Sequence, residues 1–327
     1  MTDKVKVAVY GIGNHAQRNT IPALKSSRLC ELVGLGSRDS DKASKVAEAM
    51  GCRAYSDFVQ ILDDPAVQAV YIATSPDCHI PYSRKTIEHG KHVWCEKPLA
   101  VPGDEIKEVL ALANSYDVGL FEGFMFTHHA QCRKVVELVE SGQIGAVHSL
   151  TARFGFPHLD RSNYRYDAKR GGGGLLDAGC YPVRASLELL GVPEQVSGHT
   201  TFAPNGVDLS GSAFLSYGGG KSAAFLDWGF GRSYLNEICL WGETGTLRAE
   251  RFFSKPPTLD TEITISRSNG EHEVVKVAAM NHFTAMFDEF ARASTSAGRR
   301  AKLHRDVLDQ WGVMETLFTS VGQPTGA

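Results

Sequence analysis

The chain has 327 residues and lacks the features that mark several large classes of protein. No apolar run approaches the roughly 20 residues of a membrane-spanning helix, so we expect no membrane association. The seven cysteines form no CxxC pair and no His/Cys cluster with zinc spacing, which predicts reduced thiols and no metal. A formal net charge of −3 gives no reason to expect nucleic acid as a partner. The opening "MTDKVKVAVYGIG" reads as a strand rather than a signal peptide, and we expect a cytoplasmic protein.

Strand and helix patterns alternate over the first 122 residues. The strand patterns lie at 6–13, 30–37, 66–74, 92–96 and 118–123, and the helical patterns at 15–27, 39–50, 82–90 and 104–116. The apolar runs are rich in β-branched residues and lack polar alternation, which is typical of strands buried on both faces. This alternation predicts a parallel sheet covered by helices on both faces.

The pattern changes after residue 122, where strand patterns follow one another with little helix between them. These strand patterns lie at 146–156, 195–203, 210–217, 222–231, 235–241, 245–253 and 260–266, and the helical patterns at 133–145, after the glycine run 171–174, at 282–296 and at 303–319. Strands without crossover helices predict an antiparallel or mixed sheet. We therefore predict an α/β chain with a parallel-sheet domain at residues 1–122 and an α+β domain at residues 123–327.

The sequence "GIGNHA" directly follows the first strand pattern and precedes a helix. Its G-x-G-x-x-A array of glycines permits a tight turn and a close backbone approach to a pyrophosphate at the positive end of a helix. Alone such an array fits an ordinary turn equally well, but at the first strand–helix junction of a βαβ series it predicts dinucleotide binding. The predicted cofactor loop consists of Gly11, Ile12, Gly13, Asn14, His15 and Ala16.

The end of the second strand pattern bears on which nicotinamide dinucleotide is bound. NAD-preferring sites usually place an acid there to hold the ribose hydroxyls, whereas this chain has Ser37 and Arg38, with Asp39 one residue later. An arginine can pair with a ribose 2′-phosphate and stack on adenine. We therefore predict NADP as the cofactor and leave NAD open, because Asp39 could turn inward. A solvated turn is the alternative without a functional role.

Polar residues also follow the strand pattern at 66–74, on the edge of the sheet where ligands bind in such folds. Ser75 is a candidate helix cap as well as a cofactor contact. His79 fits a packing role as well as a place beside the cofactor. The predicted cofactor contacts in this segment are Thr74, Ser75, Pro76 and His79.

The segment "HVWCEKPLA" carries a buried strand straight into a glutamate, a lysine and a proline. A surface lysine before a proline is the ordinary explanation, but this lysine lies at the same edge of the sheet as the glycine loop. There Lys97 could exchange a proton with a substrate hydroxyl or carbonyl, or hydrogen-bond a developing alkoxide. We predict that Glu96 and Lys97 contact the cofactor and that Lys97 is catalytic. Pro98 would fix the chain direction, and a cis peptide bond before it fits this position.

A second constellation lies in "GGGGLLDAGCYPV", residues 171–183. Asp177 and Tyr181 are four residues apart, so on a helix they share one face. An acid and a phenol on an apolar helix predict a pocket, with Tyr181 exchanging a proton and Asp177 accepting from a substrate hydroxyl. The alternative is a core tyrosine whose hydroxyl is satisfied locally. Pro182 should kink or restart the helix at this point.

These motifs together resemble those of the glucose–fructose oxidoreductase/inositol dehydrogenase/MocA family of NAD(P)-dependent oxidoreductases. The resemblance covers nearly the whole chain and rests on the glycine loop, "TSPDCH", "HGKHVWCEKPLA" and "GGGGLLDAGCYPV". It implies a Rossmann domain followed by a domain with a large, open, predominantly antiparallel sheet, through which members form homodimers or homotetramers. It also implies hydride transfer between the nicotinamide and a sugar or related carbon, with Lys97 as the catalytic lysine and Asp177 as the active-site acid.

The chain has Tyr181 where many members of this family have histidine. This favours the branch with glucose–fructose oxidoreductase, xylose dehydrogenase and dihydrodiol dehydrogenase, together with NADP-dependent keto-sugar reductases. The segments 121–131 and 240–257 look most like the reductases, whose substrates are nucleotide-linked 3-keto sugars. The second segment is a basic, aromatic stretch that could stack on a base, pair with a diphosphate or only seal an oligomer interface. Its candidate residues are Arg248, Arg251, Phe252, Phe253 and Lys255.

Three functions therefore compete. The leading interpretation is an NADP(H)-dependent ketoreductase of a sugar, which the resemblance suggests is nucleotide-linked. The second is an NADP-dependent aldose or dihydrodiol dehydrogenase, and the third is a sensor that binds the cofactor without hydride transfer. Arg165, just before the glycine run, is the predicted substrate or phosphate contact beside Lys97, Asp177 and Tyr181. Further pocket candidates, each as suited to a structural role, are His128, His129, Arg153, Asn163 and Tyr166.

Overall fold

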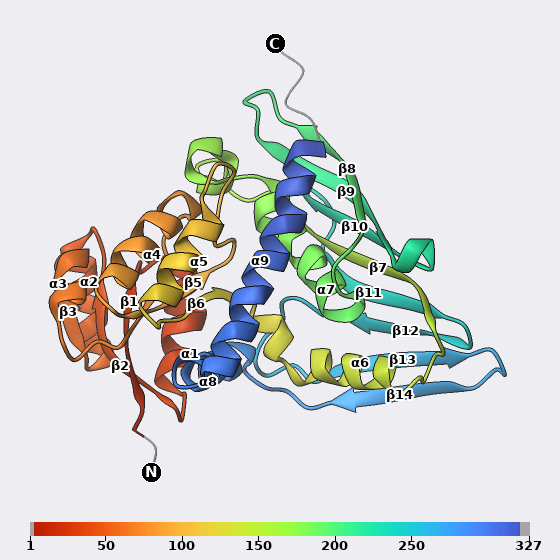
Figure 1. Cartoon of the computed structure of the whole chain (residues 1–327), viewed down its shortest axis with the longest axis horizontal. Helices are drawn as coiled ribbons and strands as arrows, with labels where there is room; N and C mark the ends of the chain where they lie inside the picture. Colours follow the sequence, from red (N-terminus) through yellow and green to blue (C-terminus); the bar gives the residue numbers. More distant parts are fainter. Residues whose placement is uncertain (1–2, 321–327) are drawn as a thin grey trace. The chain divides into compact units, whose positions relative to one another are not determined.

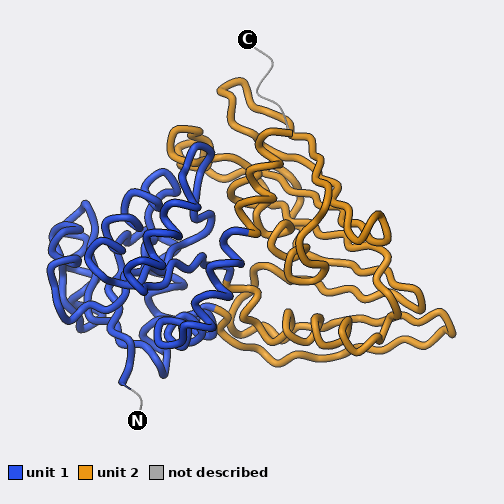
Figure 2. Tube along the Cα trace, in the orientation of Figure 1, with its two compact units in different colours: residues 1–124, 283–308 blue, residues 125–282, 309–327 orange. Residues whose placement is uncertain are grey.

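The computed structural model describes residues 3–320, which form two compact units (Figure 2). The first unit comprises residues 3–124 and 283–308, and the second comprises residues 125–282 and 309–320. Each unit has its own sheet and is described by itself. The prediction from sequence assigned residues 283–308 to the second domain, whereas the structure packs them with the first unit, because the apolar faces of these helices match its sheet.

The first unit is built on a six-stranded parallel sheet with the strand order β3-β2-β1-β4-β5-β6 (Figure 1). Its strands are β1 (Val5–Tyr10), β2 (Cys30–Gly36), β3 (Arg53–Tyr55), β4 (Ala69–Ile72), β5 (His92–Glu96) and β6 (Leu120–Gly123). The order reverses direction between β1 and β4, and in open α/β sheets ligands bind at the carboxyl ends of the strands beside such a reversal. The Rossmann-type parallel sheet predicted from sequence is therefore confirmed.

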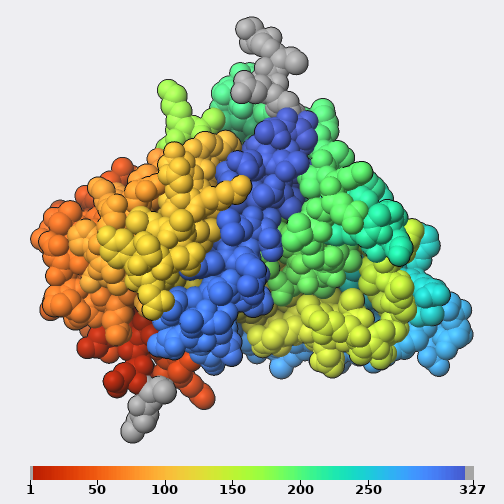
Figure 3. All heavy atoms as spheres, viewed as in Figure 1, coloured from red at the N-terminus to blue at the C-terminus, as the bar shows by residue number. Residues whose placement is uncertain are grey.

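Helices cover both faces of this sheet. They are α1 (Ile21–Lys25), α2 (Ser40–Met50), α3 (Phe58–Asp63), α4 (His79–Glu88), α5 (Ile106–Ser115), α8 (His282–Ser294) and the first half of α9 (Ala297–Ser320). In Figures 1 and 3, α4 and α5 form much of the visible surface of this unit. On β5, Trp94 packs against Phe287 and Phe290 of α8, while Cys95 faces Ser83 of α4. The alternation along "HVWCE" thus joins the sheet to helices on opposite faces.

The second unit contains an eight-stranded mixed sheet with the order β14-β13-β12-β11-β7-β10-β9-β8. Only β7 and β10 run parallel, and the other pairs are antiparallel. The strands are β7 (Val147–Phe156), β8 (Gln195–Phe202), β9 (Asp208–Tyr217), β10 (Ser222–Phe230), β11 (Leu235–Gly242), β12 (Gly245–Glu250), β13 (Thr261–Arg267) and β14 (His272–Val277). The predicted large, predominantly antiparallel sheet is confirmed.

One face of this sheet is covered by α6 (Ala130–Glu140) and α7 (Cys180–Leu190), which contact β13, β7 and β10. The covered face is apolar, as the buried Leu150, Ala152 and Phe154 of β7 show. The opposite face of β7 carries Thr151 and Arg153, in the alternation expected of a strand with one face outside the core.

The sequence patterns missed three elements, the short β3 and α3 and the edge strand β14. A strand of three residues gives too short a run for alternation to stand out, and β14 reads "HEVVKV", with most side chains exposed. Within residues 3–320 no helix is long and apolar enough to cross a membrane.

Two histidines, the buried His304 and the half-buried His92, hold the start of β6 in the first unit. His304 of α9 accepts a hydrogen bond at Nε2 from the Leu120 amide (3.0 Å), and its Nδ1 lies 3.0 Å from Asn114 Oδ1. His92 accepts at Nδ1 from the Gly119 amide (2.9 Å). Both rings must be neutral to accept these bonds, and burial lowers the pKa of each to about 4.

We expect the free energy of unfolding to fall as the pH is lowered from about 6.5 to about 4, because the unfolded chain then takes up protons on both histidines and the folded chain does not. A base with a depressed folded pKa contributes its stability above the unfolded pKa and loses it toward the folded one. His304→Gln should make the slope shallower by up to about 1.4 kcal/mol per pH unit. Urea unfolding between about pH 7 and pH 4.5 measures the slope.

The matched control is His89→Gln, since His89 is exposed at the end of α4. Its slope should equal that of the wild type. An unchanged slope in the His304 variant would contradict this account of the acid sensitivity.

Candidate active site

The glycine loop of the first unit lies at the carboxyl end of β1, where the strand order reverses. Gly11 has φ +104°, and a β-carbon there would lie 2.5 Å from the carbonyl oxygen of Ala73. Its amide donates to the Gly36 carbonyl at 2.9 Å, so the loop is held between the ends of β2 and β4. A β-carbon at Gly13 would meet no atom within 4 Å, so that stretch of backbone is open to close approach by a ligand. A π-helical turn, η1 (Ala16–Thr20), follows directly.

A carboxylate whose side chain is 13% exposed links this loop to the lysine motif. Glu96 accepts from the hydroxyl of Tyr71, and its Oε1 lies 3.3 Å from Nε2 of His15. Asn19 contacts the other nitrogen of the His15 ring at 3.1 Å. Burial would raise the pKa of Glu96, but His15, Tyr71 and Lys97 together hold it below its ordinary value. Glu96 is therefore an anion between the glycine loop and Lys97.

At the end of β2 the structure uses Asp39 as a helix cap. Its carboxylate accepts from the Lys42 amide at 2.9 Å at the start of α2, and the Asp39 amide donates to Ser37 Oγ at 3.2 Å. Because Asp39 caps α2, Arg38 is the charged side chain of this turn that has no role as a helix cap. The charge of Arg38 acts on Tyr10 and Cys78, which places it near the ends of β1 and β4.

His79 ties together two loops at the same edge. Its Nδ1 lies 2.7 Å from the Pro98 carbonyl and its Nε2 lies 3.2 Å from the Thr74 carbonyl, and the ring is 1% exposed. Burial lowers the pKa of this imidazole. The bond between Lys97 and Pro98 is cis. Ser75 occupies the cap position before Pro76, but its side chain makes no capping hydrogen bond. The structure thus places Thr74 and His79 around the segment that carries Lys97.

In the second unit Asp177 and Tyr181 lie on one continuous helical segment. A π-helical turn, η6 (Leu175–Gly179), leads into α7, and Pro182 lies in the first turn of α7. Asp177 is 6% exposed and accepts from Nε of Arg165 at 2.6 Å. Burial alone would lower the pKa of the Arg165 guanidinium, but the Asp177 carboxylate raises it overall, so the two groups form an ion pair.

The Tyr181 ring is part of an aromatic cluster. Its centroid lies 5.1 Å from that of Phe154, 5.9 Å from Phe253 and 6.0 Å from Phe126. The hydroxyl lies 3.8 Å from the sulfur of Met125, and its charge state acts on Arg165. The phenol ring is therefore held by packing, close enough to Arg165 for the two groups to interact electrostatically.

Other residues singled out in the sequence have structural contacts. His129 caps the start of α6, Asn163 caps a short 3₁₀ turn, and the Tyr166 hydroxyl accepts from the Leu159 amide. Arg153 pairs with Glu237 at 2.5 Å on the uncovered face of the sheet. The Arg133 guanidinium donates to the His128 carbonyl.

The stretch after β12 does not offer its aromatic rings at the surface. Phe252 and Phe253 are fully buried, and Lys255 is 6% exposed and donates to the Phe252 carbonyl at 2.8 Å. Arg248 pairs with Glu237, and Arg251 lies 4.5 Å from the Tyr234 ring centroid. The interpretation of this segment as a surface that stacks on a base was therefore wrong for Phe252 and Phe253.

Two contacts of these sites were not foreseen from sequence. The first is the Tyr71–Glu96 hydrogen bond, and the second is a hydrogen bond from the Leu175 amide to Asp208 on β9 at 2.6 Å. In each of these contacts the two residues are far apart in the chain. The only local sign of such a contact is a polar atom on an otherwise apolar or glycine-rich element.

A parallel sheet with a glycine loop at its reversal point, and with a mostly buried glutamate and a lysine on the same edge, is typical of a nicotinamide-dependent oxidoreductase. Comparison with known proteins agrees. A model of the oxidoreductase family with an NAD-binding Rossmann fold matches residues 5–124, and a model of the GFO/IDH/MocA C-terminal domain matches residues 132–248. The chain belongs to the GFO/IDH/MocA family of oxidoreductases, as the resemblance of its motifs predicted.

Similar proteins include sugar reductases and dehydrogenases. The chain is 34% identical over 294 residues to the dTDP-3,4-didehydro-2,6-dideoxy-alpha-D-glucose 3-reductase of Saccharopolyspora spinosa, covering 89% of this chain and 88% of the relative. It is 31% identical over 312 residues to a D-xylose 1-dehydrogenase (NADP(+)) of Haloferax volcanii, covering 94% of each. KijD10, a 3-ketoreductase from Actinomadura kijaniata solved with NADP and TDP-benzene, matches with a TM-score of 0.92 at 30% identity, over 97% of this chain and 98% of that one.

Proposed function

We propose that the protein is an NADPH-dependent ketoreductase that reduces the 3-keto group of a nucleotide-linked deoxysugar. The observation that carries the proposal is the buried acid and phenol on one helical segment, Asp177 and Tyr181. In the same chain Lys97 directly follows strand β5 of the Rossmann-type sheet. Its similarity to dTDP-sugar 3-reductases and to a 3-ketoreductase solved with NADP supports this substrate class.

The roles follow from the chemistry of each group. A bound NADPH would supply the hydride to the carbonyl carbon. The carbonyl oxygen then needs a proton, which the Tyr181 hydroxyl gives to it, while the Lys97 ammonium hydrogen-bonds the developing alkoxide. Asp177 forms an ion pair with Arg165, and its carboxylate would accept from a sugar hydroxyl. The residues proposed for the cofactor are the glycine loop, Ser37, Arg38, Thr74, Ser75, Pro76, His79 and Glu96.

The second candidate is an NADP⁺-dependent aldose or dihydrodiol dehydrogenase, favoured by the similarity to the D-xylose dehydrogenase. It would use the same groups in the opposite direction, with Tyr181 accepting the proton. A cofactor-binding sensor without hydride transfer is less well supported, because a sensor has no need of a buried acid, phenol and lysine together.

Activity assays test the proposal directly. A dTDP-linked 3-keto-deoxyhexose with NADPH should be turned over at least about tenfold faster than D-xylose with NADP⁺. Lys97→Ala and Tyr181→Phe should each lower kcat by about a hundredfold or more, because each removes a group that acts on the reacting oxygen, while NADPH binding is retained. NADPH fluorescence measures the binding.

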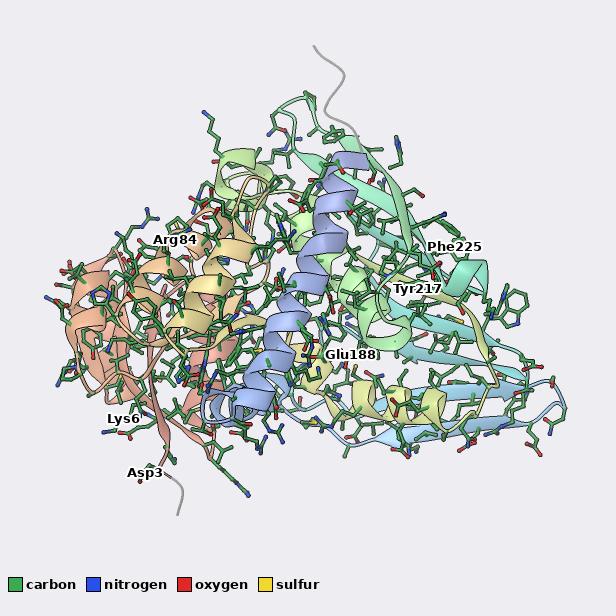
Figure 4. All side chains as sticks on the ribbon, in the orientation of Figure 1. Asp3, Lys6, Arg84, Glu188, Tyr217 and Phe225 are labelled. Atoms are coloured by element: carbon green, nitrogen blue, oxygen red, sulfur yellow. The ribbon has the colours of Figure 1, made fainter. Side chains whose placement is uncertain are left out.

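Matched controls are Lys107→Ala, an exposed lysine of α5, and Tyr217→Phe, a buried tyrosine of β9 labelled in Figure 4. Both should keep rates near those of the wild type. Rates near wild type in the Lys97 and Tyr181 variants would refute the assigned roles, and faster oxidation of xylose would favour the second candidate.

The proposal of NADP over NAD rests on Arg38, since Asp39 is committed to capping α2. Arg38→Ala should raise KM for NADPH about tenfold or more, because a charge-assisted hydrogen bond contributes about 1.5–3 kcal/mol, and should leave KM for NADH nearly unchanged. Steady-state kinetics with both cofactors measure this. Arg84→Ala, at a partly exposed arginine of α4 labelled in Figure 4, is the control. Equal changes for NADPH and NADH would contradict the role of Arg38.

We also propose that the protein forms a homodimer or homotetramer through the uncovered face of the second unit's sheet. Paired residues share one face of a sheet, and the register joins a row of side chains across seven strands. This row consists of Phe214, Phe225, Thr151, Cys239, Arg248, Thr264 and Val274. Phe225 is 47% exposed on the side of the sheet away from α7 (Figure 4), and Trp241 is 57% exposed. Large exposed aromatic side chains grouped on one face are typical of an interface.

Light scattering tests the assembly. The wild-type mass should be two or four times that of the chain, and Phe225→Glu combined with Trp241→Glu should reduce it, because two charges would then be buried at the interface. Val59→Glu, at an exposed valine of α3, should not change the mass. A wild-type monomer, or an unchanged mass in the double variant, would contradict this proposal.

We also propose a cytoplasmic location. The seven cysteines are all free thiols, which supports it.

A further inference from the structure

A carboxylate on β9 holds the start of the helix that carries Asp177 and Tyr181. Asp208 accepts from the Leu175 amide at 2.6 Å, and the Gly174 amide also hydrogen-bonds to it. Leu175 is the first residue of the π-helical turn η6. Asp208 therefore satisfies amides that the first turn of a helix leaves without an internal partner, and its charge lies at the positive end of that helix.

The lack of side chains in the glycine run leaves room for the Asp208 carboxylate. Gly173 has φ +133°, and a β-carbon there would collide with Oδ1 of Asp208. A β-carbon at Gly174 would lie 2.7 Å from the carbonyl oxygen of Leu209, the residue after Asp208. The chain thus reaches β9 only because two successive positions have no side chain. The glycines and the acid form one unit, although they are more than thirty residues apart in sequence.

The same helical segment is held at a second point. Gln310 of α9, in the second unit, donates from Nε2 to the Cys180 carbonyl at 3.0 Å and is 3% exposed. Between these two anchors lies the π-helical turn with Asp177, and Tyr181 follows directly after the second anchor. A shift at the start of so short a segment would therefore move both side chains relative to the sheet.

The surroundings of Asp208 are unfavourable for a charged group, which argues that the carboxylate has a specific role there. Burial raises the pKa of Asp208 to about 6, even though the amides of Leu175 and Gly174 favour the carboxylate. A serine or asparagine would cap a helix without this desolvation cost. Only an acceptor with two oxygens and no donor can face several amides at once without repulsion.

We propose that Asp208 is a positioning residue for the reaction, one that fixes the π-helical turn and thereby the placement of Asp177 and Tyr181. The proposal rests on the function proposed above for Asp177 and Tyr181. It gives the four-glycine motif a physical purpose beyond forming a turn, because Gly173 and Gly174 make room for the anchor.

Kinetics of Asp208→Asn and Asp208→Ala test it. We expect kcat to fall about tenfold in the asparagine variant and more in the alanine variant, because asparagine keeps one accepting oxygen. KM for NADPH, which depends on the first unit, should stay within about twofold. Asp227→Asn is the matched control, since Asp227 is an exposed acid of the neighbouring strand β10 that accepts from Ser212. A fall in kcat no larger than that of the control would overturn the proposal.

A double-mutant cycle separates positioning from general destabilisation. If Asp208 acts by placing Tyr181, Asp208→Asn should have little further effect on kcat once Tyr181→Phe is present. A full tenfold effect in that background would overturn the proposal. The unfolding midpoint of each variant shows whether part of the loss of activity comes from a smaller fraction of folded protein.

Hydrogen exchange decides the question independently of turnover. In Asp208→Asn the amides of residues 173–181 should exchange faster than in the wild type, and those of the glycine loop at residues 11–16 should not change. Unchanged exchange at 173–181 would overturn the anchoring role. If Tyr181→Phe keeps its activity while exchange at 173–181 rises, the proposed reaction roles fail and the anchor remains.

Discussion

A backbone segment that passes within contact distance of an oxygen on another strand has no room for a side chain, and both candidate sites depend on this constraint. At Gly11 the oxygen is the Ala73 carbonyl at the end of β4, and at Gly173 it is the carboxylate of Asp208 on β9. Both glycines also have positive φ, which other residues rarely adopt. In each case the close approach fixes where the following helical turn begins. The positions of the chemical groups on those turns therefore follow from missing side chains.

Buried charge is the second feature that the sites share. Glu96 is an anion because His15, Tyr71 and Lys97 offset its burial, and Asp177 is paired with Arg165. Such pairs contribute little net stability, since desolvation opposes the attraction, but they fix geometry because removing one partner is costly. In the first unit the contact between His15 and Glu96 joins the glycine loop to the lysine motif. In the second the pair of Arg165 and Asp177 joins the segment before the glycine run to the helix after it. Each site is thus bound together by charge across separate elements.

Much of the fold could be predicted from sequence, because the apolar runs of the first sheet and the alternation of the second are strong periodic signals. The glycine loop, Lys97, Asp177 and Tyr181 could be singled out from the sequence because each lies within two residues of a glycine or proline. The residues that hold these groups in place could not be identified from the sequence. Nothing in the sequence around Tyr71 or Asp208 indicates a partner that is 25 or 33 residues away. The segment 252–255 was misread because aromatic and basic residues look alike whether they line a core or a surface, and only packing against Phe126 and Phe154 distinguishes these.

The helical turns show why spacing alone is an incomplete guide to a site. Both η1 and η6 are π-helical, and each directly follows a glycine motif. A π-helical turn contains more residues than an α-helical one and frequently occurs at functional sites. A separation of four residues, as between Asp177 and Tyr181, places two side chains on one face of an α-helix, but across a π-to-α junction the second is rotated away from that alignment. The phenol thereby turns into the cluster of Phe126, Phe154 and Phe253, while the carboxylate faces Arg165. In the proposed reaction, this irregular helix lets the two groups act on different atoms of one substrate.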